Sequence, residues 1–146
     1  MIGEKHRLSE KFQQQIKDLE EASAHNDGLN LTIAINYGSR DEMIRAMRHM
    51  ADDLEAGLLS KDEITEERFA GYLDTAGLPD PDLLIRTSGE QRLSNYLLWQ
   101  LAYTEFYFTP VPWPDFDAKE LEQAVAAYNK RDRRYGGLTE KGEDHV

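Results

Sequence analysis

Apolar side chains recur at helical spacing near both ends of the chain. Over 8–24 they alternate with charged and Gln residues, which predicts an amphipathic helix that is ended by a turn at 26–28. Near the C-terminal end, Asp117 and Glu120 predict the N-terminal cap of a last helix. The pair of glycines at 136–137 predicts the end of this last helix.

Two more helices are predicted in the part of the chain that follows Gly38. Ser39 and Glu42 have the spacing of a capping box, and the helix after them carries one apolar stripe. Ser60 and Glu63 repeat the capping pattern ahead of a short helix that we expect to end near Gly77. The apolar stripe consists of Ile44, Met47, Ala51, Leu54 and Leu58.

Three short apolar runs predict β-strands. Residues 29–36 predict a short buried strand, 83–85 a second and 105–111 a third. Between the last two, 95–102 is apolar nearly all round, which predicts a short buried helix. Helices that alternate with apolar strands predict an α/β fold with a mostly parallel sheet flanked by helices.

A sheet of three strands is small for such a fold. It leaves at least one edge open, and parallel sheets are normally covered on both faces. We therefore expect an incomplete copy of a larger fold, with one domain over residues 1–137 and a solvated tail over 138–146.

Composition narrows the classes of function. The 146 residues carry a formal net charge of −11, which argues against a general nucleic-acid binder. An anionic ligand would need a local cluster of arginines acting against that charge. The chain has no cysteine, which excludes disulfides and thiolate metal sites. No apolar run approaches the roughly 20 residues that span a bilayer, and we expect a cytoplasmic protein.

The most informative segment is 82–99. Its strand ends at Arg86, a polar loop carries Arg92, and Ser94 stands where a helix would be capped. Ligands of α/β sheets bind outside the carboxyl ends of strands, and helix N-termini attract anions. Two guanidiniums and a hydroxyl there would form a cradle for phosphate or diphosphate.

A structural interpretation of the same residues is equally open. The arginines would then pair with Asp82 and Glu90 on the surface, and Ser94 would only cap a helix. Glu105, which begins the aromatic strand, is suited to hold Mg²⁺, or it is a strand-edge charge that faces water. Three arginines at 131, 133 and 134 end the last helix, where the dipole favours cations, and a structural role is expected.

Several motifs resemble those of the cis-prenyltransferases, most closely bacterial undecaprenyl diphosphate synthases. The resemblance runs from about Ile2 to Gly137. NYGSRDE (36–42) resembles an NYGGR block, with Ser39 where Gly is usual. The long block over 81–108 is the most specific, and WPDF (113–116) and RRYGG complete the pattern.

The resemblance implies roles for individual residues. Arg86, Arg92, Leu93 and Ser94 match positions that bind isopentenyl diphosphate, and Glu105 matches a glutamate that helps to hold Mg²⁺. The resemblance also implies a homodimer, in which a C-terminal Arg-x-Gly motif reaches the neighbouring subunit's active site. That motif is matched here by Arg134 and Gly136.

The implied reaction condenses isopentenyl diphosphate with an allylic diphosphate to give a polyprenyl (undecaprenyl) diphosphate, a membrane carrier lipid, so the membrane surface is a second expected location. The family's catalytic Asp belongs to an HxMDGNGRWA-like phosphate loop, and this sequence contains no such block. We therefore expect the isopentenyl diphosphate site here and no transfer by the 146 residues alone. The alternative is a non-catalytic partner subunit of a complete synthase.

Overall fold

The computed structural model describes residues 1–131, which belong to two compact units of the chain. The first unit is formed by Met1–Pro81 and Arg92–Tyr103, and the second by Asp82–Gln91 and the residues from Thr104 onward. Each unit is described by itself. Arg134, Gly136 and the predicted tail over 138–146 lie outside the described residues.

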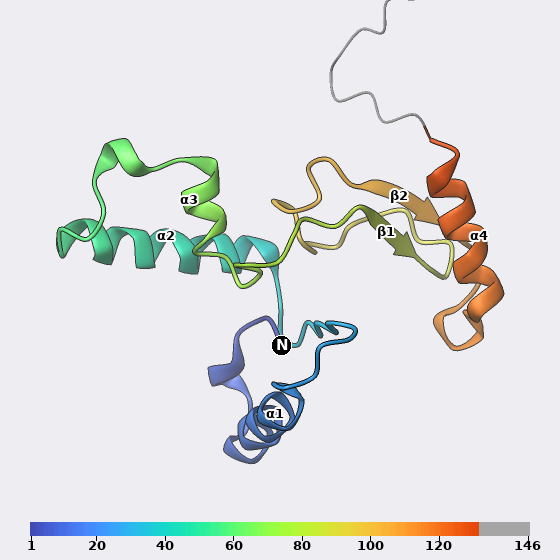
Figure 1. Cartoon of the computed structure of the whole chain (residues 1–146), viewed down its shortest axis with the longest axis horizontal. Coiled ribbons are helices and arrows are strands. Elements are labelled where there is room, and N and C mark those ends of the chain that lie inside the picture. The colour runs from blue at the N-terminus through green and yellow to red at the C-terminus, as the bar shows by residue number, and fades with distance from the viewer. Residues whose placement is uncertain (132–146) are drawn as a thin grey trace, which may run out of the picture. The chain divides into compact units, whose positions relative to one another are not determined.

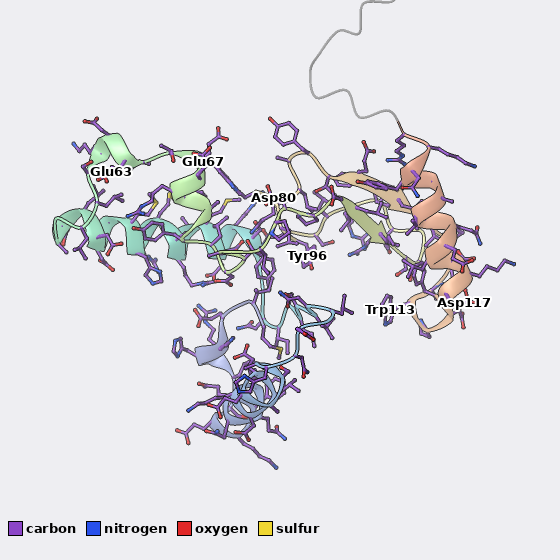
Figure 2. All side chains as sticks on the ribbon, viewed as in Figure 1. Glu63, Glu67, Asp80, Tyr96, Trp113 and Asp117 are labelled. Atoms are coloured by element: carbon purple, nitrogen blue, oxygen red, sulfur yellow. The ribbon has the colours of Figure 1, made fainter. Side chains whose placement is uncertain are left out.

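The second unit holds a parallel pair of strands and one long helix. β1 (Leu83–Arg86) pairs in parallel with β2 (Glu105–Phe108), and α4 (Ala118–Asn129) packs against β2 (Figure 1). Asp117 caps α4 by accepting a 3.0 Å hydrogen bond from the Glu120 amide (Figure 2). The predicted strands and the predicted cap are confirmed here, as is an α/β architecture with parallel strands.

The first unit is built largely from helices. Ser9 caps α1, in agreement with the amphipathic helix predicted over 8–24. The amide and the hydroxyl of Ser60 both donate to the carboxylate of Glu63, which Figure 2 labels, at 2.8 Å, so the predicted pairing of these residues is confirmed. The pair caps only a single 3-10 turn, whereas the helix after it is capped by Thr65 and ends at Ala70, not near Gly77 as predicted. The helical elements of this unit are η1 (Lys5–Arg7), α1 (Glu10–Ser23), α2 (Ser39–Glu55), η2 (Lys61–Glu63) and α3 (Glu66–Ala70).

α2 buries a different face from the one that carries the apolar stripe. Its buried residues are Ser39, Glu42, Ala46 and Met50, which follow one another at helical spacing. The predicted apolar stripe is mostly on the outside, since Ile44, Met47 and Leu58 are 45%, 49% and 71% exposed. Hydrogen bonds of Ser39 and Glu42 fix the first turn of this helix, and the apolar residues Ala46 and Met50 are buried farther along it.

The predicted strand over 29–36 is absent from the described structure. Only Ala34 forms a bridge, with Ile2, and the bridge is held by 3.0 Å bonds from the Ile2 amide to Ile33 and from the Ile35 amide to Ile2. Leu29 is 92% exposed. A strand requires a neighbour for its backbone groups, and within residues 1–131 this segment has one only around Ile2.

The predicted buried helix over 95–102 is also wrong. Asn95 and Leu97 have left-handed φ angles of 62° and 44°, which cannot belong to a right-handed helix. Turns follow up to Tyr103, and Leu97 and Leu101 are buried there. The uniformly apolar pattern thus correctly indicated burial, although the backbone conformation differs. No helix in the described part of the chain is long and apolar enough to cross a membrane.

Candidate functional site

Arg86 ends β1, as predicted, and the loop after it folds along the chain that follows β2. The Thr109 amide donates to the Arg86 carbonyl, and the amides of Ser88 and Gly89 donate to Val111 and Thr109, all at 2.9 Å. Ser88 and Gly89 have left-handed φ angles of 64° and 69°. The Arg86 side chain is half-buried at the carboxyl end of a parallel strand, the edge at which α/β sheets bind ligands.

Glu105 lies at the other end of the same strand pair. It is paired with Leu83, whereas Arg86 is paired with Phe108. Three residues of strand separate the two ends, which amounts to about 10 Å. Because side chains alternate between the faces of a sheet, Glu105 and Arg86 also point to opposite faces. The structure therefore does not bring these two predicted site residues together.

The Glu105 carboxylate forms an ion pair with the guanidinium of Arg131. A second nitrogen of Arg131 donates a 2.8 Å hydrogen bond to the Phe106 carbonyl. The sequence analysis assigned Arg131 a structural role at the end of the last helix, and these contacts fit that role. Its specific partner, Glu105, could not be inferred from the helix dipole alone.

The donor type at Glu105 fits Mg²⁺, but the number of donors does not complete a site. Among residues 1–131, no group of three His, Asp or Glu side chains is arranged to hold a metal ion. Mg²⁺ commonly takes one or two carboxylates and completes its shell with water and substrate phosphates. Glu105 can thus supply one ligand of such an ion, and the described residues do not complete the rest of the shell.

Arg92, Leu93 and Ser94 occupy a turn-rich segment of the first unit. Arg92 and Ser94 are exposed and Leu93 is half-buried. Ser94 has a left-handed φ of 51°, and no helix follows it, so its predicted role as a helix cap is wrong. Arg86 belongs to the second unit and Arg92 to the first, and their joint binding of one diphosphate stays a prediction.

The sequence analysis missed a buried carboxylate near this segment. Glu42 is 1% exposed and accepts hydrogen bonds from the Tyr37 hydroxyl at 2.5 Å and from the Asp74 amide at 2.9 Å. The Gln100 amide nitrogen reaches both Glu42 oxygens at 3.3–3.4 Å and the Thr75 hydroxyl at 2.9 Å. Burial, and next the bond to Glu42, raise the pKa of the Tyr37 phenol above its ordinary value.

This network links three parts of the first unit that are far apart in sequence. Asp74 joins it through its amide, which donates to Glu42, and its carboxylate accepts two 2.8 Å bonds from Arg45 and one 2.8 Å bond from the Gly3 amide. Burial alone would raise the pKa of Asp74, but the bonds from Arg45 and Gly3 outweigh it and the pKa is lowered. A Glu on the inner face of a helix was the available signal, and it was assigned to a capping box instead.

Comparison with known proteins identifies the family. A family model described as "Putative undecaprenyl diphosphate synthase" matches residues 1–136. The isoprenyl transferase of Brucella abortus is 51% identical over 138 residues, which cover 94% of this chain and 54% of that protein. The chain thus spans about half the length of the curated relatives it matches.

Solved structures agree with the sequence match. The crystal structure of lavandulyl diphosphate synthase from Lavandula x intermedia, in complex with dimethylallyl diphosphate, has a TM-score of 0.89 and 46% identity. The alignment covers 93% of this chain and 58% of that one. A probable undecaprenyl diphosphate synthase from Campylobacter jejuni has a TM-score of 0.79 and 36% identity, over 93% of this chain and 61% of that one.

The family model spans nearly the whole chain, and the relatives share about half of the aligned residues with it. The chain therefore belongs to the undecaprenyl diphosphate synthase family of prenyltransferases.

Proposed function

We propose that this chain carries the isopentenyl diphosphate site of a cis-prenyltransferase that makes a polyprenyl diphosphate carrier lipid. The observation that carries the proposal is the position of Arg86 at the carboxyl end of β1, followed by a loop whose amides donate to the chain that follows β2. This is the edge at which α/β sheets bind anionic ligands. The lavandulyl diphosphate synthase that resembles the chain binds dimethylallyl diphosphate, a ligand of the same chemical class.

In this proposal the chain's residues bind and orient the substrate. Arg86 and Arg92 hold diphosphate oxygens through charge-assisted hydrogen bonds, and the Ser94 hydroxyl adds a donor. Leu93 contacts the apolar part of the substrate. The half-buried position of Arg86 strengthens its pairing with an anion relative to a fully exposed side chain.

The reaction adds one five-carbon isopentenyl unit head to tail to an allylic diphosphate. The allylic substrate loses its diphosphate, the double bond of isopentenyl diphosphate attacks the resulting allylic carbon, and a proton leaves to give a cis double bond. Positive groups near the departing diphosphate stabilise the charge that develops on it. When bound, Mg²⁺ would offset part of this charge, and Glu105 would supply one of its ligands.

The proposed assembly is a homodimer in which Arg134 and Gly136 reach the partner's active site. Both residues lie outside the described residues, so the support is the motif and the exposed apolar surface elsewhere. Tyr103 and Leu58 are 83% and 71% exposed, and Ile44 and Met47 are close to half exposed. We expect sedimentation at tens of micromolar to show self-association, and a clean monomer would contradict it. The proposed location is the cytoplasm or the membrane surface, where the lipid product is used.

The test is calorimetric titration of the 146-residue chain with isopentenyl diphosphate. We expect binding that Arg86→Ala weakens about ten- to hundred-fold, the loss of one charge-assisted contact. Arg48→Ala is the matched control, because Arg48 is exposed on α2 and outside the proposed site. No binding by the wild-type chain would reject the proposal.

Transfer assays with the chain alone and with the chain added to a complete synthase, read together with the binding titration, separate the proposal from its alternative. We expect no product from isopentenyl and farnesyl diphosphates with the chain alone, because its sequence contains no HxMDGNGRWA-like block. A non-catalytic partner subunit would stimulate a complete synthase without binding isopentenyl diphosphate itself. Binding by the chain without stimulation favours the proposed function, and stimulation without binding favours the partner subunit.

A further inference from the structure

The first turn of α2 has no side-chain cap of its own. Its N-cap residue is Gly38, which has no side chain, and the next residue, Ser39, uses its hydroxyl elsewhere. The first amides of a helix have no partner within the helix, so they take an acceptor from a capping side chain, from water or from another segment. Here Asn95, which lies 55 residues away from Arg40 in the sequence, provides it.

Asn95 accepts hydrogen bonds from the first two amides of α2. Its carbonyl oxygen accepts from the Ser39 amide at 2.8 Å, and its side-chain Oδ1 accepts from the Arg40 amide at 2.9 Å. A third bond runs in the opposite direction, because the Leu98 amide donates to the Ser39 hydroxyl at 3.0 Å. Three bonds thus fasten the segment around Asn95 to the start of α2.

The backbone on both sides is shaped for this contact. Ser94 and Asn95 have consecutive left-handed φ angles of 51° and 62°, a conformation that Asn tolerates better than most residues. On the other side, a Cβ at Gly38 would lie 2.8 Å from the Asn95 side-chain nitrogen. A larger residue at position 38 would therefore push the Asn95 side chain away from the helix.

We propose that Asn95 is a positioning residue that holds Arg92, Leu93 and Ser94 in place by capping α2. The role rests on the proposed function, since it concerns the segment assigned to isopentenyl diphosphate. Ser94 is bonded directly to Asn95 in the chain, so its φ angle and the direction of its hydroxyl depend on where Asn95 is fixed. Ser39, which replaces the usual Gly of the family's block, adds the hydroxyl that binds Leu98.

Two substitutions isolate the side-chain oxygen. Asn95→Gly keeps the left-handed backbone accessible and removes Oδ1, whereas Asn95→Asp keeps an oxygen that can accept from the Arg40 amide. The matched control is Asn36→Gly, since Asn36 also has a left-handed φ, of 50°, but its side chain donates to the Glu4 carbonyl. Wild type and the three variants are compared as full 146-residue chains.

The first measurement is hydrogen exchange at the Arg40 amide, which needs no ligand. We expect Asn95→Gly to exchange about two- to ten-fold faster, the equivalent of one lost hydrogen bond, and Asn95→Asp to remain near wild type. Equal exchange in Asn95→Gly and wild type would overturn the cap.

The second measurement is isopentenyl diphosphate affinity. We expect Asn95→Gly to bind about three- to ten-fold more weakly, Asn95→Asp to regain most of this loss, and Asn36→Gly to bind as wild type. If the wild type binds and Asn95→Gly binds equally well, the positioning role is wrong and the proposed function stands. If the wild type itself does not bind, the proposed function fails and the positioning role fails with it.

Discussion

Arg131 and Glu105 form an ion pair that connects the end of α4 to the first residue of β2. The same guanidinium donates to the backbone carbonyl of Phe106, so it holds two adjacent residues of the strand. The side chains of Arg131 and Glu105 are 41% and 28% exposed, so solvent and ions can reach the pair. A metal ion that binds Glu105 must compete with this guanidinium.

Arg131→Gln should therefore raise the affinity of the chain for Mg²⁺ in the presence of isopentenyl diphosphate. The substitution removes the competing cation, at a cost of about 0.5–1 kcal/mol in the free energy of unfolding, the usual value for a partly exposed pair. Calorimetric titration and urea unfolding measure the two effects. Lys130→Gln, one residue earlier, removes an equal charge and should change neither. An unchanged Mg²⁺ affinity in Arg131→Gln would show that the pair does not compete with a metal.

Glu105→Gln and Arg92→Ala should change different properties, namely the Mg²⁺ response of turnover and the affinity for isopentenyl diphosphate. In a complete synthase that contains this sequence, Arg92→Ala should weaken isopentenyl diphosphate binding about ten- to hundred-fold and allylic binding far less. Arg92→Lys should recover only part, since Lys keeps the charge and loses the bidentate fork. Glu105→Gln should lower turnover and weaken the dependence of turnover on Mg²⁺. A titration of both substrates across Mg²⁺ concentrations checks this, and an isopentenyl affinity unaffected by Arg92→Ala would remove Arg92 from the site.

Glu42→Ala should destabilise the first unit strongly. It leaves the Tyr37 hydroxyl, the Asp74 amide and the Gln100 amide without their buried acceptor, at a cost of about 3 kcal/mol or more in the free energy of unfolding. Glu42→Gln should cost less, because its oxygen can still accept from Asp74 and its nitrogen can donate to Tyr37. Urea unfolding measures both. Equal losses in the two variants would show that packing, and not the polar network, determines the effect.

Asp74 should make the folding stability depend on pH in the acid range. Its pKa is lowered in the folded state from an ordinary value of 3.8, so its contribution is complete above about pH 4 and is lost as the pH falls through the folded-state pKa. Asp74→Asn should be less stable at pH 7 by about 1–3 kcal/mol and should lose less stability between pH 4 and 2. Asp27→Asn, in the exposed turn after α1, is the control. Parallel pH profiles for wild type and Asp74→Asn would contradict this.

The sequence predicted the elements whose signals are local. Ser60 with Glu63 and Asp117 with Glu120 act within four residues, and both caps are present in the structure. β1 and β2 are short apolar runs bounded by polar residues, and they form as a parallel pair. The end of β1 at Arg86 followed from the same local change from apolar to polar.

The elements that the sequence did not predict depend on distant partners. Ser39 and Glu42 have the spacing of a capping box, yet Ser39 accepts from Leu98 and Glu42 from Tyr37 and Asp74. Periodicity carries no information on such contacts, which form only when the chain has folded. The apolar character of 95–102 likewise indicated burial but could not reveal the left-handed residues that replace a helix with turns.

The capping of α2 by Asn95 also has a consequence during synthesis of the chain. The first turn of α2 leaves the ribosome 55 residues before the side chain that completes it. At 5–20 residues per second, this interval lasts about three to ten seconds. During that time the Ser39 and Arg40 amides lack the acceptors that Asn95 later provides. Completion of the α2 N-terminus therefore waits for the segment around Asn95, which makes this cap a late, long-range step of folding.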